Sequence, residues 1–223
     1  MTEITVRGCY STSRSPERAT VHAAISYEGP ASAPVYERVA GDLDTLAASI
    51  SPILNPDGGA ITRWSADQLR TWSNRPWHRD GSQLPLVYHA RIEVKVEFSD
   101  FGALSAWIGG QVAAIEGFAV STIEWTLIPT HREELQVEVR HRAVQDAVTR
   151  AQQYADALGL GPIRPVAVAD AGMLSDNGSS ADTPRTSQVR TAAALAGSGP
   201  EIELMPKDIE LSVAVDARFV AGS

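Results

Sequence analysis

The longest helical pattern in the chain runs from Thr130 to Gly159. Apolar residues recur there at spacings of three and four, which places them on one face of a helix. Thr130 and Glu133 predict a capping box at the start of this helix, and Gly159 predicts a left-handed stop at its end. The predicted apolar stripe contains Leu135, Val139, Ala143, Val144, Ala147, Val148, Ala151, Tyr154, Ala155 and Leu158. We expect the other segments to pack around this helix.

Alternating apolar and polar residues predict strands in the remainder of the chain. The predicted strands cover residues 3–10, 19–27, 61–72, 87–98, 119–128, 163–169 and 209–219. The alternation is clearest over 87–98, where one face is apolar and the other charged, a pattern typical of an antiparallel sheet with one solvated face. Two further helices are predicted, one opening at Pro34 and one capped by Asp100. The pattern therefore predicts an α+β fold, a mainly antiparallel sheet packed against about three helices.

A change of composition separates the last predicted strand from the rest. From Asp170 to about Pro200 the residues are mostly Gly, Ser, Ala, Thr and Asp, with little periodicity. Such a stretch predicts a long mobile loop or arm, because it is longer than a simple connection. We otherwise expect residues 1–223 to form a single domain.

The charge and the cysteine content of the chain restrict which partners the protein can bind and in which cellular compartment it is expected. The 223 residues carry a formal net charge of −8, and lysine occurs only at Lys95 and Lys207, so no basic strip is available for nucleic acid. No segment has the roughly 20 apolar residues needed to span a bilayer. The start of the chain shows no export signal, which predicts a cytoplasmic protein. The single cysteine, Cys9, is expected to be a small buried hydrophobe in the first strand.

The order of these segments resembles the SIMPL-domain family, a bacterial group that includes periplasmic immunogenic and oxidative-stress-associated proteins. The resemblance is carried by residues 4–8 (ITVRG), 15–21 (SPERATV), 92–104, 142–160 and 206–215. It covers nearly the whole chain, and the order and spacing of the segments carry it rather than any single motif.

The resemblance implies an α+β protein in which helices cover an antiparallel sheet. Some members of the family assemble into large rings, and the family offers no established catalytic residues to transfer to this chain. A link to oxidative stress is implied by the resemblance alone. Two features depart from the family pattern: the missing export signal, and Pro16-Glu17 where members often have Pro-Asp.

The titratable residues predict no cofactor or metal site. The histidines are His22, His78, His89, His131 and His141. Their spacing is not that of zinc ligands, and one cysteine cannot build a thiolate site. His141 with Gln145 and Asp146, and His131 with its neighbouring glutamates, could form acid–base groups, but both groups fall near the polar face of the long helix, where a solvated charged face is the favoured interpretation.

One cluster of aromatic and basic residues stands out as a candidate site. It contains Trp64, Arg70, Trp72, Arg75, Trp77, His78 and Arg79. Aromatic and arginine side chains gathered in a loop are typical of an interface anchor. The alternatives are that the tryptophans merely cap the sheet, or that the cluster forms a small-ligand pocket.

These observations favour a non-enzymatic protein that acts through homo-oligomeric assembly. The expected contacts are exposed strand edges and the loop from Trp72 to Arg79, with the arm ordering on assembly or lining a lumen. A second hypothesis is an adaptor that presents the arm to a protein partner. A third is an enzyme acting on a small anion at Arg70, Arg75, His78 and Arg79, which would require these side chains to converge on a pocket.

Overall fold

The computed structural model describes residues 1–77, 83–174 and 206–222. The predicted α+β fold is confirmed: helices accompany two antiparallel sheets. The chain divides into two compact units. The described residues of the terminal unit are 1–15, 127–174 and 208–222, and those of the central unit are 16–77, 83–126 and 206–207. The predicted arm lies mostly at 175–205, outside the described residues.

The central unit is built on a five-stranded sheet. Its strands are β2 (Arg18–Gly29), β3 (Ile61–Ala66), β4 (Arg70–Asn74), β5 (Val87–Phe98) and β6 (Phe118–Thr126). The order is β3-β5-β2-β6, and β4 pairs with the other end of β5 on the side of β3. The predicted strand over 61–72 is therefore two strands, interrupted at residues 67–69.

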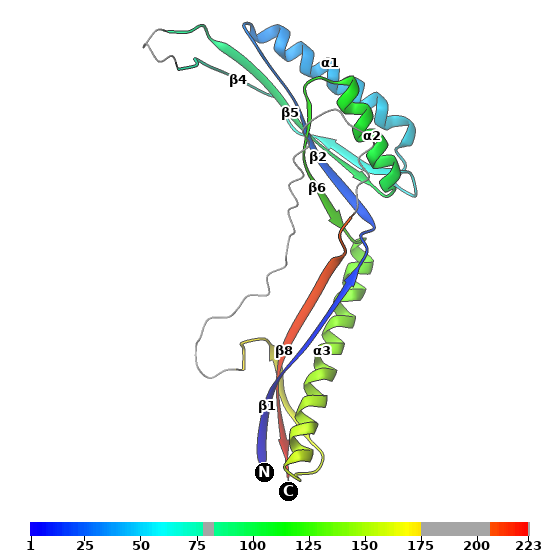
Figure 1. The fold of residues 1–223 in the computed structure, drawn as a ribbon, viewed down its shortest axis with the longest axis vertical. Coiled ribbons are helices and arrows are strands. Elements are labelled where there is room, and N and C mark those ends of the chain that lie inside the picture. The colour runs from blue at the N-terminus through cyan, green and yellow to red at the C-terminus, as the bar shows by residue number, and fades with distance from the viewer. Residues whose placement is uncertain (78–82, 175–205, 223) are drawn as a thin grey trace. The chain divides into compact units, whose positions relative to one another are not determined.

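Two helices cover one face of this sheet, α1 (Ser32–Ile50) and α2 (Phe101–Ala114) (Figure 1). A short 3₁₀ helix, η1 (Ser51–Ile53), follows α1. The predicted cap of α2 is confirmed, since the Asp100 carboxylate accepts from the backbone nitrogens of Gly102 and Ala103 at 2.9 and 3.0 Å. The core between the helices and the sheet contains large side chains, among them Ile25, Leu46, Ile50, Phe98, Leu104 and Trp107. The opposite face of the sheet is polar, as the alternation in β5 predicted.

The terminal unit pairs the two ends of the chain. Strand β8 (Ile209–Ala221) lies between β1 (Thr2–Arg14) and β7 (Arg164–Asp170), all antiparallel. Thr2 is paired with Ala221, so the termini lie side by side (Figure 1). The long helix α3 (Pro129–Ala157) packs against β1 and β8. The predicted stop is confirmed at Gly159, whose φ is +66°.

The contact between α3 and β1 is unusually close. The buried helical positions Ala143, Ala147, Ala151 and Ala155 are spaced by four. At Gly8 of β1, an added Cβ would lie 2.1 Å from the carbonyl oxygen of Ala143 and 2.6 Å from the nitrogen of Ala147. Small side chains on both elements therefore let the helix backbone rest on the strand.

Two expectations about α3 were wrong. The helix begins at Pro129, and its described N-terminus has no side-chain cap, because proline already presets the first helical turn without an N–H to satisfy. Val148, Tyr154 and Leu158 are exposed by 42 %, 60 % and 64 %. The buried residues of α3 are spaced by four, so each is rotated by about 40° around the helix axis from the one before it. The three exposed side chains lie beside this row of buried residues and not on it.

Candidate functional site

The predicted interface cluster centres on β4, which is an edge strand. It pairs with β5 over residues 70–74, without a register shift. Among the residues that the structure describes, no strand pairs with its outer edge. All five residues of β4 are exposed. The strand therefore presents unpaired backbone groups together with accessible side chains.

Trp72 is held on the polar face of the sheet by His89. The two residues are cross-strand partners, and their rings stack with centroids 5.1 Å apart and planes 6° apart. His89 Nε2 lies 2.6 Å from Asn74 Oδ1, and His89 Nδ1 lies 3.5 Å from a carboxylate oxygen of Glu28. Contacts from β2 and β4 thus fix the His89 imidazole on which the indole rests. The indole remains 48 % exposed.

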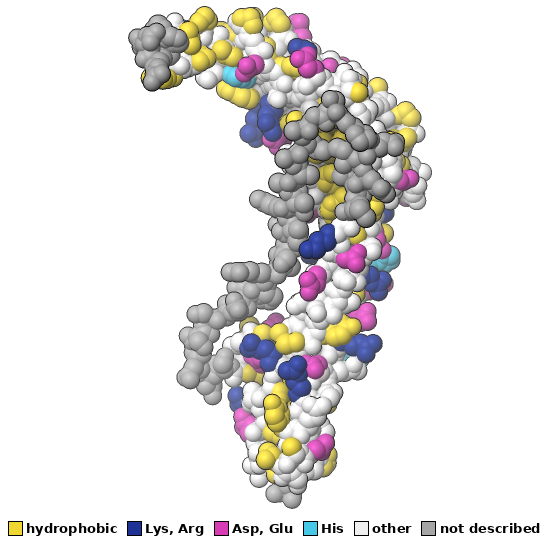
Figure 2. Space-filling view, viewed as in Figure 1, with side chains coloured by type: hydrophobic (Ala, Val, Ile, Leu, Met, Phe, Trp, Pro, Cys, Tyr) yellow, Lys and Arg dark blue, Asp and Glu magenta, His cyan; other side chains and the backbone are white. Residues whose placement is uncertain are grey.

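Beyond β4 the aromatic surface continues to Trp77, which is 82 % exposed. Hydrophobic side chains gather on this part of the surface in the space-filling view (Figure 2). Arg75 donates from Nη1 to the carbonyl oxygen of Leu84 at 3.2 Å, across the connection from β4 to β5. His78 and Arg79 lie outside the described residues.

Trp64 does not belong to this surface. It lies on β3 opposite Val96, on the face covered by the helices, and packs against the central core. The structure thus brings together Arg70 and Trp72 on β4, places Arg75 and Trp77 just beyond them, and separates Trp64. The position of Trp64 fits the alternative interpretation, in which a tryptophan caps the sheet.

A small pocket of about 230 Å³ lies at the interruption between β3 and β4. It is lined by Asp67, Gln68, Arg70, Trp72, Arg91 and Glu93. Arg91 and Glu93 are an ion pair at 3.3 Å, and two carboxylates balance the two guanidinium groups. The pocket is therefore not a concentrated anion site, and Arg75 is not among its lining residues. Sequence reasoning missed Arg91 and Glu93, although their alternate spacing on β5 places them on the same face.

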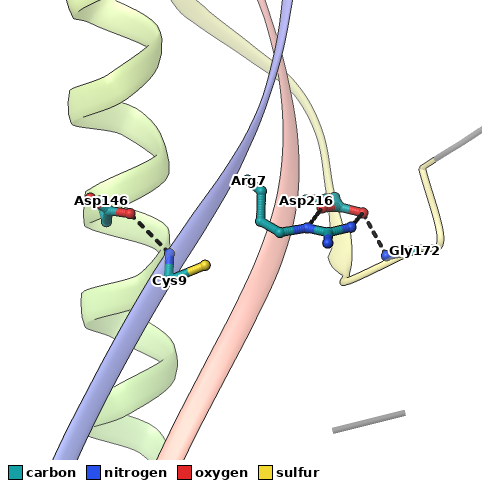
Figure 3. Close-up of polar contacts among 5 residues, drawn as sticks. All are labelled: Arg7, Cys9, Asp146, Gly172 and Asp216. Carbon is teal, nitrogen blue, oxygen red and sulfur yellow. Dashed lines mark hydrogen bonds and ion pairs between the residues drawn. The ribbon is translucent and has the colours of Figure 1, made fainter. Parts of the chain in front are cut away.

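A second polar site lies in the terminal unit around Asp216 of β8 (Figure 3). Asp216 is 7 % exposed, and its carboxylate accepts from Arg7 Nε at 2.7 Å and from Arg7 Nη2 at 3.3 Å. The backbone N–H of Gly172 donates to the same carboxylate at 2.6 Å. The Arg7 hydrogen bond is the main cause that lowers the pKa of Asp216, while burial opposes it.

These contacts fix the turn that follows β7. Arg218 also donates to the carbonyl oxygen of Leu174 at 3.4 Å and forms an ion pair with Glu3 at 3.0 Å. At the other end of the undescribed stretch, Ser15 Oγ donates to Asp208 Oδ1 at 2.9 Å. Polar side chains of the terminal unit therefore anchor the described residues on both sides of 175–205.

Cys9 is exposed, so the expectation of a buried hydrophobe was wrong. Residues of β1 alternate between the face toward α3 and the opposite face, and Cys9 follows Gly8 onto the uncovered face. Its backbone N–H donates to Asp146 Oδ2 at 2.9 Å (Figure 3). This hydrogen bond is the main cause that lowers the pKa of Asp146.

The suggested acid–base group at His141 is not assembled. His141 Nε2 lies 3.4 Å from Gln145 Nε2, whereas Asp146 binds Cys9 and Arg150 instead. Within residues 1–77, 83–174 and 206–222, metal-ligating side chains nowhere gather in groups of three or more. No helix in the described part of the chain combines the length and hydropathy that crossing a bilayer requires.

The fold and this geometry define an α+β protein with an exposed aromatic edge strand. The family model described as "SIMPL: Protein of unknown function (DUF541)" matches residues 4–219. The chain therefore belongs to the SIMPL family, and the family match extends across both compact units. A comparison with curated proteins finds no match.

Proposed function

We propose that this SIMPL protein is non-enzymatic and acts by self-association through the surface formed by β4 and Trp77, here called the β4 surface. The observation that supports the proposal is the exposure of two tryptophans, Trp72 by 48 % and Trp77 by 82 %. A tryptophan buries about 150–250 Å² when fully covered, and tryptophans are enriched among the residues that dominate binding energy. An isolated protomer leaves this apolar area in water.

The rigidity of Trp72 supports an interface in particular. Its ring is stacked on His89, so little side-chain freedom remains to be lost when a partner covers it. The neighbouring unpaired edge of β4 adds backbone donors and acceptors. Together they supply an apolar anchor and a directional contact in one place.

The charges around the β4 surface favour a second copy as the partner. Arg70 and Arg91 are matched by Asp67 and Glu93 in the adjoining pocket. A surface with balanced charges does not repel an identical surface, whereas a surface of one sign would. We therefore expect an association that depends weakly on salt.

The direct test is the double substitution Trp72→Ala with Trp77→Ala. The mass in solution, measured by light scattering on a sizing column, should fall to that of the protomer, because the anchor is lost. Tyr36→Ala is the matched control, since Tyr36 is an aromatic residue of α1 in the same unit and is 49 % exposed. An assembly that survives the double substitution would contradict the proposal, and so would a control variant that dissociates equally.

A second candidate function is that of an adaptor whose 175–205 segment meets a protein partner. It is favoured by the anchoring of Gly172 to Asp216 and of Asp208 to Ser15, on either side of that segment. Limited proteolysis of the assembled protein separates the two functions. Immediate cleavage within 175–205 favours the adaptor, and protection favours assembly.

A further inference from the structure

We propose that two copies pair along the outer edges of β4, antiparallel, about a two-fold axis that lies midway between Trp72 of one copy and Trp72 of the other. This arrangement rests on the proposed self-association and specifies its geometry. It would join two five-stranded sheets into one continuous sheet.

Among the described edge strands, β4 is the one whose outer backbone is neither interrupted nor covered. Strand β7 carries Pro165 and a register shift, and β6 is shifted against β2. On β3, a register shift is accompanied by a bridge from Leu54 to Ile61. On β1, the Asp146 carboxylate accepts the backbone N–H of Cys9. Prolines, bulges and covered backbone groups are among the ways in which proteins block edge pairing. Strand β4 has none of these three, and its protection is confined to its short length and to Arg70.

The alternation of side chains restricts where the axis can lie. A two-fold axis perpendicular to the sheet keeps each side chain on its original face, and directly opposed residues must share a face. Neighbouring residues point to opposite faces, so one residue of β4 must lie directly opposite the same residue of the second copy, with the axis midway between them. An axis at a given residue has this meaning. It also leaves α1 and α2 of both copies on the same side of the joined sheet.

Strand length then selects Trp72. An axis at Trp72 pairs every residue of Arg70–Asn74 with the second copy. An axis at Thr71 would pair only residues 70–72, and an axis at Ser73 only residues 72–74. An axis at Arg70 would set that guanidinium against its own copy, and like charges directly opposite destabilise a sheet.

The resulting side-chain pairs are compatible on both faces. Trp72 meets Trp72 of the second copy, and each indole keeps its stack on His89. Thr71 lies opposite Ser73 of the second copy, which allows a hydroxyl–hydroxyl hydrogen bond, and Arg70 lies opposite Asn74. Aromatic pairs and Thr–Ser pairs are among those that stabilise antiparallel sheets.

Cysteine cross-linking tests the register in the full chain. Thr71→Cys and Ser73→Cys are each placed in a Cys9→Ser background. Three samples are compared: each variant expressed alone, and the two variants co-expressed. Thr71 and Ser73 are exposed, so the substitutions spare the core. Opposed residues are about 4.5–5.5 Å apart, within reach of a disulfide, whereas Thr71 lies about 8 Å from its own copy, beyond the limit of about 7 Å.

The axis at Trp72 predicts cross-linked dimer in the co-expressed sample, on the order of tenfold above either variant alone. Cross-linking of Thr71→Cys alone would move the axis to Thr71, and cross-linking of Ser73→Cys alone would move it to Ser73. Either result overturns the register and leaves self-association standing. An oligomer by light scattering without any cross-link shows that the β4 edges do not pair. A monomer by light scattering refutes the proposed function itself, and the register with it.

Discussion

The core of the central unit and the contact between α3 and β1 in the terminal unit are stabilised in opposite ways. The central core contains large side chains such as Phe98 and Leu104, whereas the interface of α3 with β1 is built from alanines and Gly8. In the first, stability comes from the area and volume that each side chain fills. In the second, it depends on the absence of side-chain atoms, because the helix backbone itself approaches the strand. Removing atoms should therefore damage the central core, and adding atoms the close contact between α3 and β1.

The comparison extends to polar contacts. In the terminal unit, the buried Asp216 links β1, β8 and the turn after β7. In the central unit, Tyr27 of β2 donates to Asp42 of α1 at 2.6 Å and accepts from the N–H of Gly117 at 2.7 Å. In each unit, therefore, a polar residue joins three segments. Asp216 carries a charge in this role, whereas Tyr27 does not.

Phe98→Ala should cause the largest loss of stability. Phe98 is fully buried, and its ring packs against Trp107 with centroids 5.4 Å apart. Truncating a buried phenylalanine typically costs about 3–5 kcal/mol. All five tryptophans lie in the central unit, so urea unfolding followed by tryptophan fluorescence measures that unit. A loss below about 1 kcal/mol would contradict the account of the central core.

Gly8→Ala should destabilise the terminal unit by about 1–3 kcal/mol or more, because overpacking forces the backbone to move. Unfolding followed by far-UV circular dichroism, which reports α3, measures the effect. Gly109→Ala is the matched control, since the same methyl group meets no atom within 4 Å in the exposed middle of α2. It should stabilise the protein by about 0.5–1 kcal/mol. Equal effects of the two substitutions would disprove the difference between the units.

Asp216→Asn should cost about 1–2 kcal/mol at neutral pH, because charge-assisted hydrogen bonds from Arg7 and Gly172 are weakened. Arg7 is 55 % exposed, so solvent screens part of the ion pair. The pKa of Asp216 is lowered in the folded protein. Its contribution is therefore fully present above the ordinary aspartate pKa of about 3.9 and is lost as the pH falls through the lowered pKa.

Chemical denaturation at a series of pH values tests this contribution. The difference between the wild type and Asp216→Asn should shrink below about pH 4. Glu210→Gln, which removes a carboxylate from an exposed position of the same strand, should show little difference at any pH. A pH-independent difference for Asp216→Asn would rule out the charge as its cause.

Tyr27→Phe should have the smallest effect, a loss of about 0.5–1.5 kcal/mol, because two hydrogen bonds to the hydroxyl are removed while the ring is kept. The contact of Arg38 with the ring, 4.0 Å from the centroid, is retained. Thermal or urea unfolding should show a lower stability for Tyr27→Phe than for Tyr36→Phe, a control at an exposed residue that is expected to be neutral. A loss as large as that of Phe98→Ala would contradict the assignment of two ordinary hydrogen bonds to this hydroxyl.

Local patterns predicted much of the fold. The strand over 87–98, the Asp100 cap and the stop at Gly159 were predicted and are confirmed, since each depends on neighbouring residues alone. The boundary between β3 and β4 was missed. Both segments are rich in strand-forming residues, and the interruption at residues 67–69 is visible only against their common partner β5.

Contacts between distant residues could not be predicted in the same way. Arg7 and Asp216 are 209 positions apart, and only the pairing of β1 with β8 brings them together. The exposure of Cys9 depends on which face of β1 is covered by α3. For the candidate site, the composition of residues 70–77 indicated an aromatic surface, but the separation of Trp64 from it required the register of β3.

The central claim is self-association through the β4 surface, and the mass of the intact protein in solution tests it most directly. Light scattering on a sizing column at two concentrations and two salt levels should give a discrete multimer that resists dilution and changes little with salt. A protomer mass of 23.8 kDa under all four conditions would contradict the claim.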